Sequence, residues 1–182
     1  ADEGDLAGAL RGLAQFQGDH PAVAAVEAQV TALVNTPAPP ERGTTEEVRL
    51  RRTAEWFRGN GVEVIFARIA CLKEDGRDRS LSQKKPGWNY LLLPKDKNDS
   101  QVVPELAPKD DEIVLCKTTD SALTGTNLRL ILRNMEIKNV IVAGIFTDQC
   151  ISSTVRSLAD ESFNVVVIDD CCAAGTDDLH EK

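Results

Sequence analysis

Apolar residues along the chain fall into short, nearly continuous runs. Four runs rich in β-branched residues predict buried strands, at residues 62–70, 112–117, 139–145 and 164–170. Other segments instead repeat their apolar residues every three or four positions, which predicts helices that bury one face. These helices are expected at residues 22–34, 44–61, 125–137 and 148–162.

Because continuously apolar strands alternate with helices, the pattern predicts a parallel sheet covered on both faces, an α/β fold. We expect one domain over residues 1–182, with both ends shorter than in relatives. Ligands of such sheets bind at the carboxyl ends of the strands. Lys117 and the turn 144–150 both lie at strand ends, so we expect them to share one edge of the sheet.

The formal net charge of −8 disfavours nucleic acid and anionic membranes as partners. The sequence shows no signal peptide and no apolar run of about 18 residues, so we expect neither secretion nor a membrane span. Five cysteines and two histidines, His20 and His180, show no zinc-ligand spacing and no disulfide framework. We therefore predict a reducing, cytoplasmic setting, no metal and no cofactor.

Cys150 lies where the strand 139–145 gives way to a helix. The positive end of a helix dipole and the free backbone N–H groups there favour a thiolate and can bind an oxyanion. A lysine at the end of a nearby strand would favour the thiolate further, and Lys117 has that position. Two plainer interpretations stay open: Cys150 is a small buried apolar residue, and Lys117 is a solvated strand end.

The other cysteines fit structural roles better. Cys71, Cys171 and Cys172 follow strands and Cys116 lies within one. Cys171 is the second candidate nucleophile, because it too lies past a strand end, although no apolar helix follows it closely.

Residues 73–90 form a long polar connection. Such connections are often functional, so this one is either an active-site lid carrying Trp88 and Tyr90 or a solvated excursion. Asp120 and Ser121 either cap the following helix or line the loop.

The run DEIVLCKTTDSALTGTNLRLILRNMEIKNVIVAGIFTDQCISSTVRSLADESFNVVVIDDCCAAGTDDLH, residues 111–180, resembles the isochorismatase-like cysteine hydrolases. Nicotinamidases, N-carbamoylsarcosine amidohydrolases, ureidoacrylate hydrolases and biuret hydrolases belong to this superfamily. Their pattern is a strand ending in Lys, a Ser-Ala-Phe-like segment and Gly-Thr-x-Leu opening a helix. A strand of the type V-x-G-x-x-T-x-x-C follows, and later a strand ending in Asp-Ala. The resemblance is clear from about residue 62 onwards and implies a three-layer α/β/α fold with a central parallel sheet.

The resemblance implies site residues one by one. Cys150 matches the nucleophile, Lys117 matches the catalytic lysine, and Thr147 matches the threonine of the motif. The backbone N–H groups of Phe146 and Cys150 match the oxyanion hole, which a cis peptide between Ile145 and Phe146 would hold open. Leu123 stands in the pocket wall where relatives more often have phenylalanine.

The third catalytic residue of the family is an aspartate in a first strand of the type L-x-x-I-D-x-Q, which we do not find. In one explanation the chain starts just after that strand, because ADEGDLAGAL resembles the segment that follows it in relatives. In the other, residues 29–35 are a remnant of the strand and Asn35 occupies the aspartate position. The metal-binding Asp/His cluster of nicotinamidases is also not evident.

The resemblance implies a hydrolase that cleaves a C–N bond of a small amide, ureido or carbamoyl compound through a thioester. It also implies a small-molecule substrate and a homo-oligomer. Because true isochorismatases lack the nucleophilic cysteine, Cys150 favours C–N over enol ether cleavage. A binding or regulatory protein that keeps the fold without the chemistry remains the alternative.

Overall fold

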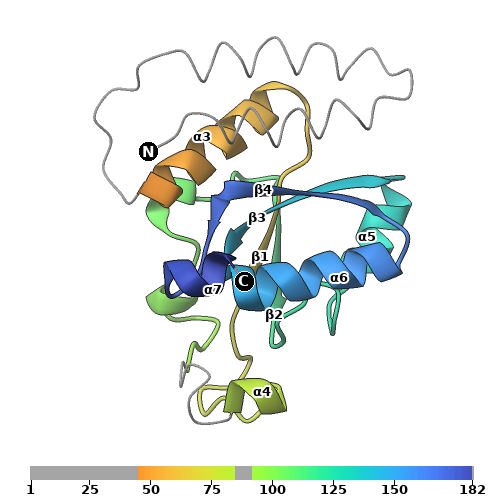
Figure 1. Cartoon of the computed structure of the whole chain (residues 1–182). Helices are drawn as coiled ribbons and strands as arrows, with labels where there is room; N and C mark the ends of the chain where they lie inside the picture. The colour runs from red at the N-terminus through yellow and green to blue at the C-terminus, as the bar shows by residue number, and fades with distance from the viewer. Residues whose placement is uncertain (1–44, 85–91, 182) are drawn as a thin grey trace.

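The computed structural model describes residues 45–84 and 92–181; the predicted helix at 22–34 lies outside this description. Figure 1 shows the arrangement of the described elements. No helix among these residues is long and apolar enough to cross a membrane. In chain order the elements are α3 (Thr45–Gly59), β1 (Ile65–Ile69), α4 (Leu81–Lys84), the 3-10 turns η1 (Asn98–Ser100) and η2 (Pro104–Leu106), β2 (Ile113–Lys117), α5 (Leu128–Asn134), β3 (Asn139–Ile145), the π-helical turn η3 (Thr147–Ile151), α6 (Ser152–Asp160), β4 (Asn164–Ala173) and α7 (Asp177–Glu181).

The strands are parallel, as the sequence predicts, and they form two pairs. β1 pairs with β2, and β3 pairs with β4. Within the described residues no hydrogen-bonded ladder joins the two pairs, so the expected single continuous sheet is not seen there. α3 and α6 cover opposite faces of the β3–β4 pair (Figure 1). The predicted α/β class is confirmed.

The core lies between the strands and the helices α5 and α6. Leu158 on α6 is 1% exposed and packs with apolar residues from both strand pairs. This packing fixes α6, and with it the turn that precedes it, against β3. The buried members of the cluster are Leu115, Ala122, Leu123, Leu128, Leu132, Val142, Ile151, Leu158 and Cys172.

The ends of several strands and helices differ from those that the apolar runs predict. β1 is shorter than the run 62–70, and α5 is shorter than the run 125–137. β4 is longer than predicted and continues to Ala173. The pairing shifts register between Val142 and Gly144, so that Gly144 pairs with Cys172 and the strand extends beyond its apolar run.

A largely shielded ion pair fastens α3 to the start of β2. Arg58 Nε and Nη2 donate to the two carboxylate oxygens of Glu112 over 2.6 and 2.7 Å, and the two side chains are 13% and 9% exposed. The hydrogen bond from Arg58 is the main reason that the pKa of Glu112 lies below its ordinary value.

We expect Glu112→Gln to lower the free energy of unfolding at pH 7 by about 2 kcal/mol, because it leaves a largely shielded guanidinium without its counter-charge. A carboxyl whose pKa is lowered by folding stabilises the protein above its unfolded pKa and stops doing so as pH falls through the folded value. The difference between the two proteins should therefore shrink below about pH 4. Urea unfolding at pH 7 and at acid pH measures both effects.

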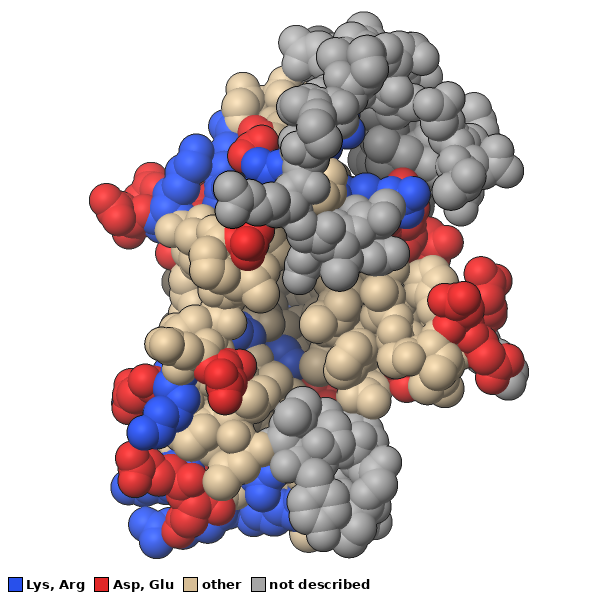
Figure 2. Space-filling view, turned by 90° about the vertical axis from the view of Figure 1, so that its left-hand side faces the viewer, with Lys and Arg blue, Asp and Glu red and all other residues tan. Residues whose placement is uncertain are grey.

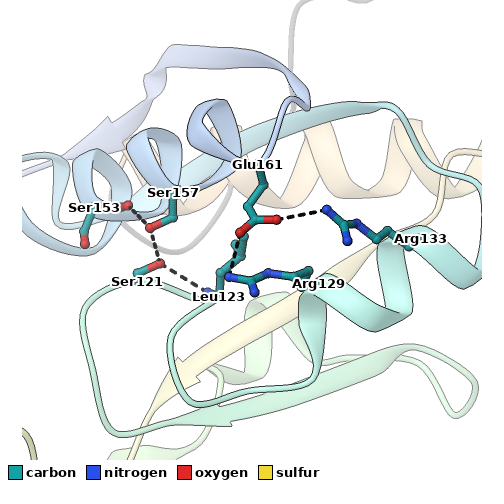
Figure 3. A network of polar contacts seen from close by, with 7 residues as sticks. All are labelled: Ser121, Leu123, Arg129, Arg133, Ser153, Ser157 and Glu161. Atoms are coloured by element: carbon teal, nitrogen blue, oxygen red, sulfur yellow. Dashed lines mark hydrogen bonds and ion pairs between the residues drawn. The ribbon is translucent and has the colours of Figure 1, made fainter.

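Glu161→Gln is the matched control. Glu161 forms ion pairs with two arginines, Arg129 and Arg133, over 2.7 and 3.0 Å, but the arginine side chains are 52% and 59% exposed (Figure 3). Exposed pairs contribute about 1 kcal/mol or less. Equal losses in the two variants would show that burial of the Arg58–Glu112 pair has no special weight.

Candidate active site

A lysine ammonium and a cysteine sulfur meet at the carboxyl ends of β2 and β3. Lys117 Nζ lies 3.1 Å from Cys150 Sγ and donates a second hydrogen bond, also 3.1 Å long, to the carbonyl oxygen of Thr119. Lys117 is only 4% exposed, so little water surrounds its charge. A buried ammonium is stable only with polar or charged partners. The contact therefore stabilises negative charge on the sulfur, as a nucleophilic cysteine requires.

The turn that carries Cys150 follows β3 directly. The peptide bond between Ile145 and Phe146 is cis, where the resemblance implies one. The Phe146 carbonyl oxygen accepts hydrogen bonds of 3.1 Å from the N–H groups of both Gln149 and Ile151. Cys150 therefore lies in the π-helical turn η3 ahead of α6, whereas the sequence predicts an unbroken helix from residue 148.

Gly144 leads the chain into this turn with a φ of +127°. Residues with a Cβ rarely adopt this conformation. A Cβ at this position would meet Ile151 Cδ1 at 3.7 Å, an ordinary contact. The backbone conformation, and not crowding, therefore accounts for the glycine.

Hydrogen bonds tie the loop after Lys117 to the helix after Cys150. The Ser121 hydroxyl donates to Ser157 Oγ over 2.9 Å, and the Ser157 hydroxyl donates to the carbonyl oxygen of Ser153 over 3.0 Å (Figure 3). The backbone N–H of Ala122 donates to Thr154 Oγ1 over 3.0 Å. These contacts hold β2 and α6 in a fixed relation, so the lysine and the cysteine keep their distance.

Asp120 is the carboxyl next to this pair along the chain. It does not cap α5, whose N-cap is Asn127. Burial raises the pKa of the Asp120 carboxyl, while the charge of Lys117 and the amide of Gln83 act in the opposite direction. Asp120 Oδ1 and Gln83 Nε2 are buried, and neither has a hydrogen-bond partner among the described residues.

The second candidate nucleophile is contradicted by its place in the fold. Cys171 lies inside β4 and is 1% exposed, because β4 runs three residues further than the apolar pattern suggests. Burial raises the pKa of Cys171 and of Cys71, and raises that of Cys172 to about 11. These three thiols therefore stay protonated and unreactive near neutral pH.

The predicted pocket residues have different outcomes. Leu123 is 5% exposed and packs in the core cluster, and its place in a pocket wall stays a prediction. Trp88 and Tyr90 lie outside the described residues, as does Asn35, the positional candidate for the catalytic aspartate. Of the connection 73–90, the described part ends with the short helix α4, which the sequence did not predict.

His180 is a neighbour of the site that the sequence did not reveal. It lies on α7, and its Nδ1 is 2.8 Å from Oγ1 of Thr147, the first residue of η3. The two residues are 33 positions apart, and no local pattern links them. The one local signal is the stretch TDDLH, whose two aspartates suit the first turn of a short helix.

In Figure 1, β3 and β4 run toward the left-hand side of the molecule. Figure 2 shows that side facing the viewer. It is hollowed, with basic atoms at the floor of the recess, uncharged side chains over much of its walls and acidic atoms near its lower edge. In residues 45–84 and 92–181 no group of three His, Cys, Asp or Glu side chains is placed to hold a metal ion.

A model of the isochorismatase domain matches residues 32–182. The uncharacterized isochorismatase family protein YrdC of Bacillus subtilis is 35% identical over 102 residues, covering 50% of this chain and 54% of YrdC. The ureidoacrylate amidohydrolase RutB of Acinetobacter baylyi is 35% identical over 99 residues, covering 54% of this chain and 40% of RutB. The chain thus spans about half of the length of these curated relatives.

Solved structures share the fold. An isochorismatase family protein from Desulfovibrio vulgaris superposes with a TM-score of 0.68 at 26% identity, over 81% of this chain and 77% of that one. N-carbamoylsarcosine amidase from Thermoplasma acidophilum superposes with a TM-score of 0.62 at 25% identity, over 76% of this chain and 78% of that one.

Proposed function

The chain belongs to the isochorismatase family of hydrolases, as the sequence resemblance implied, and we propose that it hydrolyses a C–N bond of a small amide, ureido or carbamoyl compound through Cys150. The observation that carries the proposal is the 3.1 Å contact between Lys117 Nζ and Cys150 Sγ. A structural cysteine has no need of a buried ammonium beside it, whereas a thiolate nucleophile does.

In the proposed reaction the Cys150 thiolate attacks the substrate carbonyl carbon and forms a C–S bond. The carbonyl electron pair moves to oxygen, and the N–H groups of Phe146 and Cys150 bind the resulting oxyanion. The tetrahedral intermediate then expels the nitrogen, which takes up a proton, and leaves a thioester on the cysteine. Water attacks the thioester, releases the acid or carbamate and returns the thiolate.

The leaving nitrogen needs an acid. The family resemblance assigns that role to an aspartate of a first strand, and its positional candidate here, Asn35, lies outside the described residues. Within the described residues no ion pair joins Lys117 to a carboxylate. This observation is what favours the second candidate function, a binding or regulatory protein with the fold but without turnover.

The names of two relatives narrow the substrate panel. RutB acts on ureidoacrylate, and the Thermoplasma enzyme acts on N-carbamoylsarcosine. We therefore expect this chain to release ammonia from one or more ureido or carbamoyl compounds, measured with a coupled ammonia assay over a panel that also holds simple amides. Isochorismate is tested beside the panel with an assay for pyruvate, because cleavage of its enol ether releases no ammonia. Binding of a panel compound without ammonia release would favour the binding protein, and cleavage of isochorismate alone would favour the enol ether reaction.

A further inference from the structure

A hydrogen bond joins α7 to the turn that carries the candidate nucleophile. Thr147 Oγ1 and His180 Nδ1 are 2.8 Å apart, a normal length for an O–H to nitrogen bond. Thr147 is the first residue of η3, and Cys150 is the fourth. The His180 side chain is 20% exposed, so water competes with the bond only weakly.

The second ring nitrogen of His180 indicates the direction of the bond. Nε2 lies 3.6 Å from Oδ1 of Asp169 on β4, a carboxylate that favours a proton on Nε2. We assign the tautomer with its proton on Nε2, so Nδ1 accepts the hydrogen bond from the Thr147 hydroxyl. Asp169 is 64% exposed, so this contact orients the ring and adds little to stability.

The bond acts on a turn that Lys117 also contacts, through the sulfur of Cys150. Within η3, the N–H groups of Gln149 and Ile151 both donate to the carbonyl oxygen of Phe146. The contact of Thr147 with His180 connects the start of the turn to α7, while the Lys117 contact lies near its end. We propose that His180 is a positioning residue which, through Thr147, fixes the oxyanion-binding N–H groups of the turn relative to the cysteine.

This inference rests on the proposed function, because oxyanion binding matters only for attack on a carbonyl. An oxyanion hole works when its donors stand about 2.7–3.1 Å from the developing charge, and losing one donor entirely costs about 10²–10³ in kcat. Loosening the turn without removing a donor should cost less. We expect a fall of about tenfold in kcat, the rate factor that corresponds to about 1.4 kcal/mol.

Three replacements of one residue separate the bond from the bulk of the ring. His180→Phe keeps a ring and removes both nitrogens. His180→Asn places a polar atom near the position of Nδ1, whereas His180→Gln places one nearer to Nε2. We expect the phenylalanine and glutamine variants to lose about tenfold in kcat with little change in KM, and the asparagine variant to recover most of that loss.

Alkylation by iodoacetamide supplies the control within each variant. The reagent is attacked at an sp³ carbon and forms no oxyanion, so the rate at which it labels Cys150 should stay within about twofold of the parent while hydrolysis falls. Thr147→Val removes the same bond from its other end. Combined with His180→Phe it should cause no further loss, because the two changes remove one interaction.

The proposal is overturned if His180→Phe hydrolyses at the parent rate, if asparagine rescues no better than glutamine, or if the losses of Thr147→Val and His180→Phe multiply. Should the parent cleave no panel compound, the proposed function fails while the positioning claim is still tested by hydrogen–deuterium exchange of the peptide covering residues 145–151. Faster exchange there in His180→Phe and not in His180→Asn supports the claim, and unchanged exchange overturns it. Unchanged exchange in β1 and β2 shows that the variant is folded.

Discussion

Replacing Cys150 with alanine or serine is expected to lower the hydrolytic rate by about 10⁴-fold or more, the scale of loss when an enzyme's nucleophile is removed. Alanine has no atom that can form the thioester. Serine keeps the shape, but its hydroxyl ionises far less readily than a thiol, and Lys117 at 3.1 Å cannot act as a base while it is protonated. The ammonia assay with the best panel compound measures the loss.

Cys116→Ala is the matched control for this change. Cys116 is a free, half-buried thiol next to Lys117 in the chain, and its sulfur makes a weak contact of 3.7 Å with the carbonyl oxygen of Ala70. Its loss should leave hydrolysis within about twofold of the parent, since no reacting atom is removed. If the Cys150 variants retain parent activity, the covalent mechanism is wrong.

Lys117→Met is expected to lower the hydrolytic rate by about 10²-fold or more, comparable to the loss of one donor to a developing charge. Methionine preserves most of the length and the apolar stem of the side chain but removes the ammonium that contacts Cys150 Sγ. The sulfur then loses its nearest positive charge in a site shielded from water. Its alkylation by iodoacetamide at pH 7 should slow together with hydrolysis.

Lys138→Met tests whether any lost lysine would have the same effect. Lys138 is exposed and precedes β3, at the end of the strand opposite to Cys150. Lys138→Met should leave the rates of hydrolysis and of Cys150 alkylation unchanged. If Lys117→Met keeps the hydrolysis and alkylation rates of the parent protein, the lysine is only a structural partner of the cysteine and takes no part in its activation.

Much of the fold could be predicted because burial dictates it locally. The run NVIVAGI is apolar on both faces and ends at Gly144, and the strand β3 occupies those residues, Asn139–Ile145. α3 likewise ends at Gly59, one of the two glycines that mark its end in the sequence. Pairing could not be predicted in the same way. The register shift that extends β4 through Cys171 depends on contacts with β3, about 25 residues earlier in the chain. The division of the strands into two pairs likewise depends on contacts between residues distant in sequence.

The candidate site shows the same division. Lys117 and Cys150 could be brought together from sequence, because the carboxyl ends of parallel strands share an edge. The contact of His180 with Thr147 could not, since a short helix with two acidic residues at its start looks like an ordinary solvated segment. The burial of Gln83 beside Asp120 could not be predicted either, because it depends on how a long connection folds back over the end of β2.

The rate at which iodoacetamide labels Cys150 at pH 7, followed by peptide mapping together with residual hydrolysis, tests the central claim most directly. An ordinary cysteine is only a few per cent thiolate at this pH, so an activated one should react about tenfold faster or more. The account predicts that Cys150 is labelled ahead of the buried Cys71, Cys171 and Cys172, and that hydrolysis falls in proportion to the labelled fraction. Labelling of Cys150 no faster than that of a free cysteine, or full hydrolysis by the labelled protein, would contradict it.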